Sequence, residues 1–103
     1  MVVAEISVLP LGTGSPSLSD YVAKAVEVLR KRGLKYQVTA MGTLVEGELG
    51  EILEAVREMH EAVLEAGAQR VITTLKVDER RDKPLSLEGK VEAVRKRLEE
   101  GRT

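Results

Sequence analysis

An alternation of apolar and polar positions over residues 2–9, "VVAEISVL", is the first strong pattern in the chain. Successive side chains of a strand point to opposite faces, so a two-residue period separates one face from the other. One face here is wholly apolar and consists of Val2, Ala4, Ile6 and Val8. The pattern predicts a strand with one face in the core and one mixed face.

Helical spacing of apolar residues follows this strand after a short loop. Ser17 and Asp20 have the spacing of a capping box, and Pro16 precedes them, so a helix is expected to start there. Its apolar residues recur at three- and four-residue intervals. Basic residues and Gly33 mark its carboxyl end.

The remaining periodicity predicts two strands, a helix, a strand and a helix. Residues 35–48 alternate in polarity but are interrupted at Gly42, which indicates two short strands joined by a tight turn or bulge. The strongest helical stripe runs over 49–66, and alternation returns over 70–78. A last helix is expected over 87–99.

This order, β-α-β-β-α-β plus a carboxy-terminal helix, predicts an α+β fold of the ferredoxin-like type. Such a sandwich has an antiparallel sheet, with the first and last strands adjacent and both inner helices on one face. We expect residues 1–103 to form a single domain of this kind. The opposite, open face of the sheet should then carry Glu5, Ser7, Leu9, Thr74, Lys76 and Asp78.

Composition excludes several classes of function. The chain has 103 residues and a formal charge of −1, with 16 basic and 17 acidic side chains interspersed, so no long-range field attracts nucleic acid. No apolar run approaches the roughly 20 residues that a membrane span requires. The amino terminus lacks the features of a signal peptide, which predicts a cytoplasmic protein. Abundant Lys, Arg and Glu with no Asn favour a thermophilic source.

Catalytic and metal chemistry find little support in the sequence. His60 is the single histidine and there is no cysteine, so neither a nucleophilic pair nor a metal-ligand cluster is indicated. Acylphosphatases share the element order but use a catalytic asparagine, which this chain lacks. The loop "LPLGTGSPSLSDYV" has two closely spaced glycines but neither complete nucleotide-binding motif, which favours a turn and helix start. We therefore expect no enzyme activity, no metal and no cofactor.

Two interpretations of the open sheet face remain. It can be a solvated surface with a cross-strand Glu5 and Lys76 pair. Alternatively, a second subunit covers it and encloses small polar groups such as Ser7, Thr39 and Thr74, which would then need partners or a bound ligand.

Several segments together resemble a known family. They are "LPLGTGSPSLSDYV", "MGTLVEGE", "HEAV" with "GAQRVITTLKVDERRD", and "KVEAVRKRL". These strings are similar to those of the YkoF-like, thiamine-binding family of small ferredoxin-like proteins, long catalogued as an uncharacterised protein family. The resemblance implies a non-enzymatic, cytoplasmic protein that assembles as a homodimer or homotetramer and binds thiamine or its hydroxymethylpyrimidine part.

Candidate ligand contacts follow from the chemistry of that ligand. Hydroxyl groups can serve the aminopyrimidine edge, and Glu46 or Glu5 can balance the thiazolium charge. Tyr36 is an available aromatic face, although its alternation favours core packing. Lys76, Arg80 and Arg81 are the counter-charges for a phosphorylated ligand. The ligand-binding candidates are Ser7, Thr13, Gly42, Thr43, Glu46, Thr74 and Lys76.

Two other functions stay open at this point. A ferredoxin-like regulatory sensor of another small metabolite, such as an amino acid, would hold its effector at glycine-rich turns between subunits. A purely structural, oligomeric interaction protein would use the polar face as an interface only. A panel of ligands distinguishes these from a thiamine-binding protein.

Overall fold

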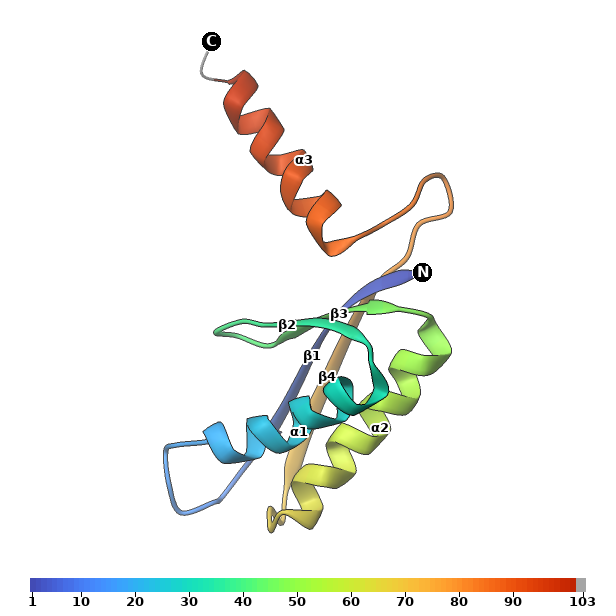
Figure 1. Cartoon of the computed structure of the whole chain (residues 1–103). Coiled ribbons are helices and arrows are strands. Elements are labelled where there is room, and N and C mark those ends of the chain that lie inside the picture. The colour runs from blue at the N-terminus through green and yellow to red at the C-terminus, as the bar shows by residue number, and fades with distance from the viewer. Residues whose placement is uncertain (102–103) are drawn as a thin grey trace.

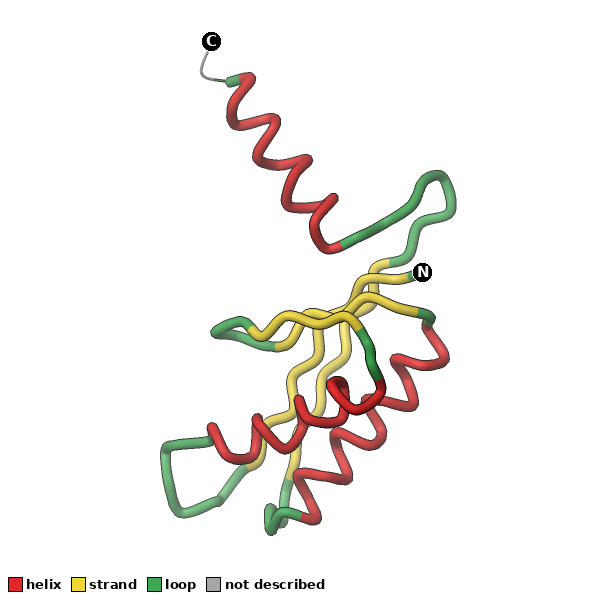
Figure 2. The backbone as a smooth tube through the Cα atoms, in the orientation of Figure 1, coloured by secondary structure: helices red, strands yellow, loops and turns green. Residues whose placement is uncertain are grey.

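One antiparallel sheet forms the centre of the computed structural model, which describes residues 1–101 (Figure 1 and Figure 2). Its strands follow the order β2-β3-β1-β4. Their bounds are β1 Val2–Pro10, β2 Lys35–Val38, β3 Thr43–Gly47 and β4 Val71–Asp78. The long strand β1 is therefore central, and it pairs with β3 on one side and β4 on the other.

Two helices, α1 (Ser19–Arg32) and α2 (Leu49–Glu65), cover the same face of the sheet (Figure 1). Their buried positions are apolar residues at helical spacing, such as Ala25 and Leu29 on α1. Helix α3 (Leu87–Glu100) follows a loop and stands away from the other elements (Figure 2). The predicted ferredoxin-like fold with an additional carboxy-terminal helix is thus confirmed.

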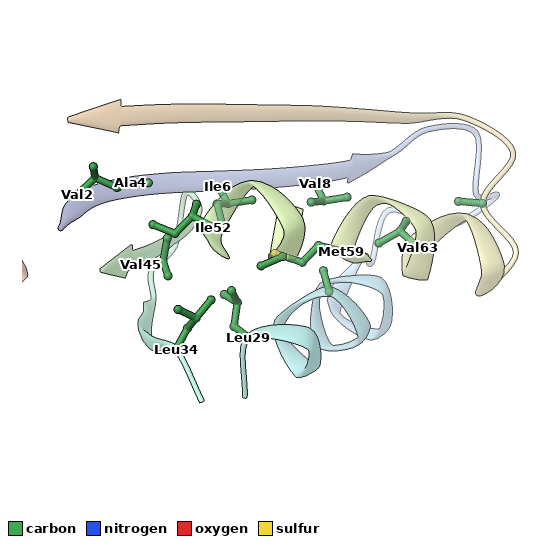
Figure 3. Packing of buried hydrophobic residues seen from close by; sticks show 13 residues of the cluster. Val2, Ala4, Ile6, Val8, Leu29, Leu34, Val45, Ile52, Met59 and Val63 are labelled. Atoms are coloured by element: carbon green, nitrogen blue, oxygen red, sulfur yellow. The ribbon is translucent and has the colours of Figure 1, made fainter. Parts of the chain in front are cut away.

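The core lies between the sheet and this helix pair, as Figure 3 shows. Alternate residues of β1 point into it from the sheet, and Ile52, Met59 and Val63 of α2 meet them from the helix side. Ile52 and Val63 are fully buried. Tyr36 packs against the edge of this cluster, as its alternation predicts. The apolar face of the sheet packs against the apolar faces of α1 and α2. Because the periodicity of the sequence identifies these faces, it predicts the arrangement of the sheet and helix layers.

The register of the sheet agrees with the predicted open face. Glu5 lies opposite Lys76, and Ser7 lies opposite Thr74. Glu5 and Lys76 make no ion pair, however. The Glu5 side chain lies beside Gly42 instead, where a Cβ atom would come within 3.3 Å of its Cγ atom.

The predicted capping box at the start of α1 was wrong. The helix begins at Ser19 with Leu18 as its N-cap, and no side chain caps it. The Ser15 hydroxyl accepts a hydrogen bond from the Ser17 backbone N–H at 3.1 Å. The serines close a turn inside the loop because their hydroxyls compete for local backbone groups before the helix begins.

Candidate functional site

The turn between β2 and β3 is closed by the side chain of Thr39. Its Oγ1 donates to the Gly42 carbonyl at 2.7 Å and accepts from the backbone N–H groups of Met41 and Gly42. The Thr39 N–H also donates to the Gly42 carbonyl at 2.9 Å. These bonds confirm the tight turn predicted near Gly42. They also commit the Thr39 hydroxyl to the backbone, which removes it from the open sheet face.

A pocket of about 260 Å³ lies between this turn, the first half of α1 and the middle of β1. We call it the hairpin pocket. It is lined by Ile6–Leu9 of β1, Leu18, Val22, Ala25 and Val26 at α1, residues 38–43 of the turn, and Met59 of α2. Every lining side chain is apolar or an uncharged hydroxyl. The β2 and β3 hairpin projects beside α1 (Figure 1), which places the turn at the pocket.

Thr43 gives the inner side of this largely apolar pocket a group that can form hydrogen bonds. It lies opposite Ile6 in the sheet register, so it faces the helices. Its exposed fraction is 5%, and it is the one polar residue in the buried set within residues 1–101. Its hydroxyl makes no hydrogen bond to any described residue. The hydroxyl oxygen itself is not enclosed, because the buried side-chain atom without a partner within residues 1–101 is Arg32 Nε. The Thr43 hydroxyl is therefore open to the pocket and can bond water or a ligand there.

Other candidate residues lie around the pocket or on the open face. Gly42 lines the pocket beside Thr43, and Ser7 borders it from β1. Thr13 lies in the loop between β1 and α1, where its Oγ1 donates to the Ser15 carbonyl at 2.9 Å. Thr74 and Lys76 lie on the opposite face of the sheet from Thr43, since their register partners on β1 are odd-numbered.

Glu46 is engaged elsewhere, at the amino end of α3. Its Oε1 accepts a hydrogen bond from the Leu87 N–H at 3.0 Å. Its Oε2 is 3.7 Å from the Lys35 Nζ, which also contacts Glu88 at 2.7 Å. The hydrogen bond from Lys35 lowers the pKa of Glu88 below its ordinary value. Glu46 therefore anchors the first turn of α3 in this chain.

The charged segment after β4 forms a surface loop with internal ion pairs. Arg80 Nε donates to Asp82 at 2.7 Å, and this hydrogen bond lowers the pKa of Asp82 to about 2. Arg81 lies 3.8 Å from Glu79. A wide, shallow hollow beside this loop includes Glu46 and Met1. It is separate from the hairpin pocket, with which it shares no lining residue.

The structure thus gathers Ser7, Gly42 and Thr43 at one pocket and distributes the other candidates. The sequence reasoning missed the apolar part of the pocket wall, especially Met41, Leu18 and Val22. An available signal was the position of Met41, an apolar residue at the tip of a predicted turn. An apolar side chain at the tip of a turn cannot reach the core and stays exposed. Its exposure indicates a contact with a ligand or another chain.

The described part of the chain contains neither a membrane-spanning helix nor a cluster of metal ligands. No helix within residues 1–101 is long and apolar enough to cross a membrane. Over the same residues, no three side chains among His, Cys, Asp and Glu gather in a way that could hold a metal ion.

The chain is similar to known proteins over nearly its whole length. The model of a family described as "Thiamine-binding protein" matches residues 4–95. A UPF0045 protein of Methanothermobacter thermautotrophicus is 54% identical over 99 residues, covering 95% of this chain and 100% of the relative. The UPF0045 protein YqgV of Bacillus subtilis is 41% identical over 103 residues, covering 96% of this chain and 99% of that protein.

Solved structures agree with these sequence matches. A hypothetical protein of Methanocaldococcus jannaschii has a TM-score of 0.85 at 49% identity, covering 90% of this chain and 94% of that one. A Thermotoga maritima protein described as a candidate in thiamine biosynthesis or salvage has a TM-score of 0.75 at 31% identity, covering 90% and 97%. With the fold, the family match and the near full-length relatives in agreement, the chain belongs to the thiamine-binding protein family.

Proposed function

We propose that this protein binds thiamine or its hydroxymethylpyrimidine part in the hairpin pocket and has no catalytic role of its own. The observation that carries the proposal is the hydroxyl of the buried residue Thr43, which is open to the pocket and has no internal partner. A bound aminopyrimidine edge both donates and accepts hydrogen bonds, so it supplies what Thr43 lacks. The apolar wall from Leu18, Val22 and Met59 would pack against the ring faces.

Gly42 and Thr43 are the proposed contacts within the pocket, together with the backbone of Ser7, whose side chain lies on the open face opposite Thr74. Thr13 belongs to the loop that leads into α1, and we include it as a residue that borders the entrance. Thr74, Lys76 and Glu46 are separated from the pocket in one copy of the chain. They can contribute to a ligand only through a second copy, and we assign them no direct contact in the hairpin pocket.

We also propose that the protein works in the cytoplasm as a homo-oligomer. The apolar stripe of α3, formed by Val91, Val94 and Leu98, is more than 60% exposed at each position. Leu9 and Ile72 are likewise exposed on the open face of the sheet, at 40% and 46%. A helix of this length is marginally stable in water unless its apolar face is packed. We propose that a second copy of the chain, which has the same two apolar surfaces, covers the α3 stripe and the open sheet face.

Titration calorimetry with thiamine and with hydroxymethylpyrimidine tests the ligand proposal. We expect binding to the wild-type protein and at least tenfold weaker binding to Thr43→Val, which keeps the side-chain shape but removes the hydroxyl. Thr43→Ser restores the hydroxyl and should recover most of the affinity.

Three results would contradict this proposal. One is no heat and no thermal shift with either compound at millimolar concentration. Another is equal affinity for wild type and Thr43→Val. The third is a response to amino acids but not to thiamine, which would favour the regulatory-sensor alternative.

A further inference from the structure

Strand β4 lies at one edge of the sheet, and within residues 1–101 it pairs with β1 alone. The Leu11 N–H donates to the Arg70 carbonyl at 2.9 Å, in the same register that places Pro10 opposite Val71. Hydrogen-bonded and non-hydrogen-bonded positions alternate along an antiparallel pair. The even-numbered residues of β4 therefore bond to β1, and the odd-numbered ones direct their N–H and C=O groups to the free edge. These outward residues are Val71, Thr73, Leu75 and Val77.

The free edge of β4 lacks the features that protect sheet edges from pairing. Natural edges are kept short, are bulged, or carry proline or several charges. Strand β4 has eight residues without proline, and it pairs with β1 at every position from Val71 to Asp78, so it has no bulge. The other edge strand, β2, has four residues and ends at the Thr39 turn. Strand β4 is therefore the edge that offers a template for another strand.

An apolar strip of α2 runs beside this edge. His60 Nδ1 lies 2.7 Å from Thr73 Oγ1, which places the His60 side of the helix at β4. Glu58, on the other side of the helix, pairs with Arg32 of α1. Leucines at helical spacing from His60 share its side. They are Leu49, Leu53 and Leu64, and they are 39%, 49% and 39% exposed. The edge thus combines unpaired backbone groups with exposed apolar side chains.

A second copy of β4 in antiparallel orientation fits this edge. All outward N–H and C=O groups find partners in one register, in which Val71 faces the partner's Val77 and Thr73 faces the partner's Leu75. Thr74 then lies on the two-fold axis, opposite the partner's Thr74. The two sheets become one continuous sheet with the helices α1 and α2 of both copies on the same face, and the leucine strips of the two α2 helices meet across the axis.

The charges along β4 favour the same register. In this register Ile72 faces the partner's Lys76, whose aliphatic stem covers the isoleucine. Sliding the strands by two residues in one direction would place Lys76 opposite the partner's Arg70. Sliding them in the other direction would place Ile72 opposite the partner's Asp78. The first arrangement opposes like charges, and the second places a carboxylate against an apolar side chain.

We infer that β4 is an interface between two copies of this chain, which pair antiparallel about Thr74 into one continuous sheet. This inference rests on the proposed function only in that the protein associates with itself. The surface is distinct from the α3 stripe and from the open sheet face, so it gives the assembly a further contact. It also places Ser7 and Thr74 of both copies in one row across the axis, because these residues are register partners within each chain.

Cysteine cross-linking tests the edge, because the chain has no cysteine of its own. Facing residues at a non-hydrogen-bonded position have Cα atoms about 4.5 Å apart, within the range of a disulfide. Thr74→Cys should therefore give disulfide-linked pairs of chains on oxidation with diamide. Ser7→Cys is the matched control, because Ser7 lies beside Thr74 on the same sheet face but one strand farther from the edge. Its two copies are three strand spacings apart, roughly 14 Å, and should not link.

Two charge variants at Ile72 test the register. Both are made together with Val94→Glu, which removes association through the α3 stripe. Ile72→Glu places a carboxylate opposite the partner's Lys76, whereas Ile72→Lys places a second cation there. The first should associate about tenfold more tightly than the second, since opposite charges attract across a strand pair and like charges repel. Both variants lose the same apolar side chain, so their difference isolates the charge across the edge. Sedimentation equilibrium over a concentration series measures it.

Four results would overturn the inference. One is a Thr74→Cys protein that stays unlinked although the wild type is larger than one chain, which would leave the proposed homo-oligomer intact. Another is equal linking of Thr74→Cys and Ser7→Cys, because the open sheet faces would then be in contact instead. A third is equal or reversed association of the two Ile72 variants. The last is a wild-type mass of one chain, which would overturn the proposed homo-oligomer as well. Circular dichroism of each variant confirms that the comparison is made between folded proteins.

Discussion

Two threonines of the β2 and β3 hairpin have opposite roles although they are four residues apart. The Thr39 hydroxyl makes three hydrogen bonds that close the turn. Thr43 is a buried residue, but its hydroxyl is open to the hairpin pocket and makes none with the described residues. One hydroxyl therefore supports the fold, while the other is free for the ligand contact that we propose.

Substituting each threonine by valine should change stability in opposite directions. Thr43→Val replaces the unpaired hydroxyl of a buried residue by a methyl group and should stabilise the ligand-free protein by about 0.5–1 kcal/mol, since no internal bond is lost. Thr39→Val breaks the turn bonds and should destabilise it by about 1 kcal/mol. Denaturant unfolding of the two variants and the wild type measures both values. A loss of stability in Thr43→Val would show that its hydroxyl has an internal partner.

The elements themselves could be predicted from the sequence, and their contacts only in part. Alternation and helical spacing depend on neighbours in the chain, so they predict the strands, the helices and the placement of Glu5 and Lys76 on one sheet face, but they do not predict whether these two side chains form an ion pair. The role of Glu46 could not be predicted this way. It caps a helix that begins 41 residues later along the chain, and no local period records such a contact. The capping box predicted before α1 was wrong for a local reason. A capping box and a loop turn use the same residue types, so the serines alone do not distinguish them.

Helix α3 is attached to the sheet through its first turn. Ser86 accepts a hydrogen bond from the Gly89 N–H at 2.9 Å, and Glu46 accepts one from Leu87. Lys35 pairs with Glu88, and Lys90 pairs with Asp78. Leu87 itself is 8% exposed. One buried leucine surrounded by polar bonds therefore fixes where the helix starts and which way it points.

This attachment should loosen in acid. The pKa of Glu88 is lowered in the folded state by its hydrogen bond from Lys35. A carboxylate with a lowered pKa stabilises the fold above its unfolded-state pKa, and that contribution is lost as the pH falls through the lowered value. Amide signals of residues 87–90 in NMR spectra should shift over that range. The Glu88→Gln variant should lack this transition, and an identical transition in the variant would assign it to another group.

At the scale of the whole molecule, the chain is more extended than its length requires. The Cα radius of gyration is 15.8 Å, compared with about 13 Å for a compact domain of 100 residues. The projection of α3 accounts for the difference (Figure 1). A shape of this kind leaves apolar surface exposed on a helix and on a sheet face of the same chain.

Assembly should therefore depend on the α3 stripe. Light scattering should give a mass of at least twice the 11.3 kDa chain for the wild type. Val94→Glu should reduce that mass towards the single chain, because a buried carboxylate without a partner opposes association. Lys96→Glu puts the same side chain on the opposite side of the helix and should leave the mass unchanged. A wild-type mass equal to one chain would contradict the proposed oligomer.

Because α3 is attached only through its first turn, a small rotation there is amplified into a larger displacement at its far end. The helix has 14 residues and so extends about 21 Å at the usual rise per residue. A rotation of about 10° at its first turn would move the far end by roughly 4 Å over that length. Under the proposed assembly, a substitution at Glu46 or Lys35 would shift the neighbouring copy without altering any residue of the interface. Relatives that differ at these two positions can then share one fold and one pocket and still assemble at different angles.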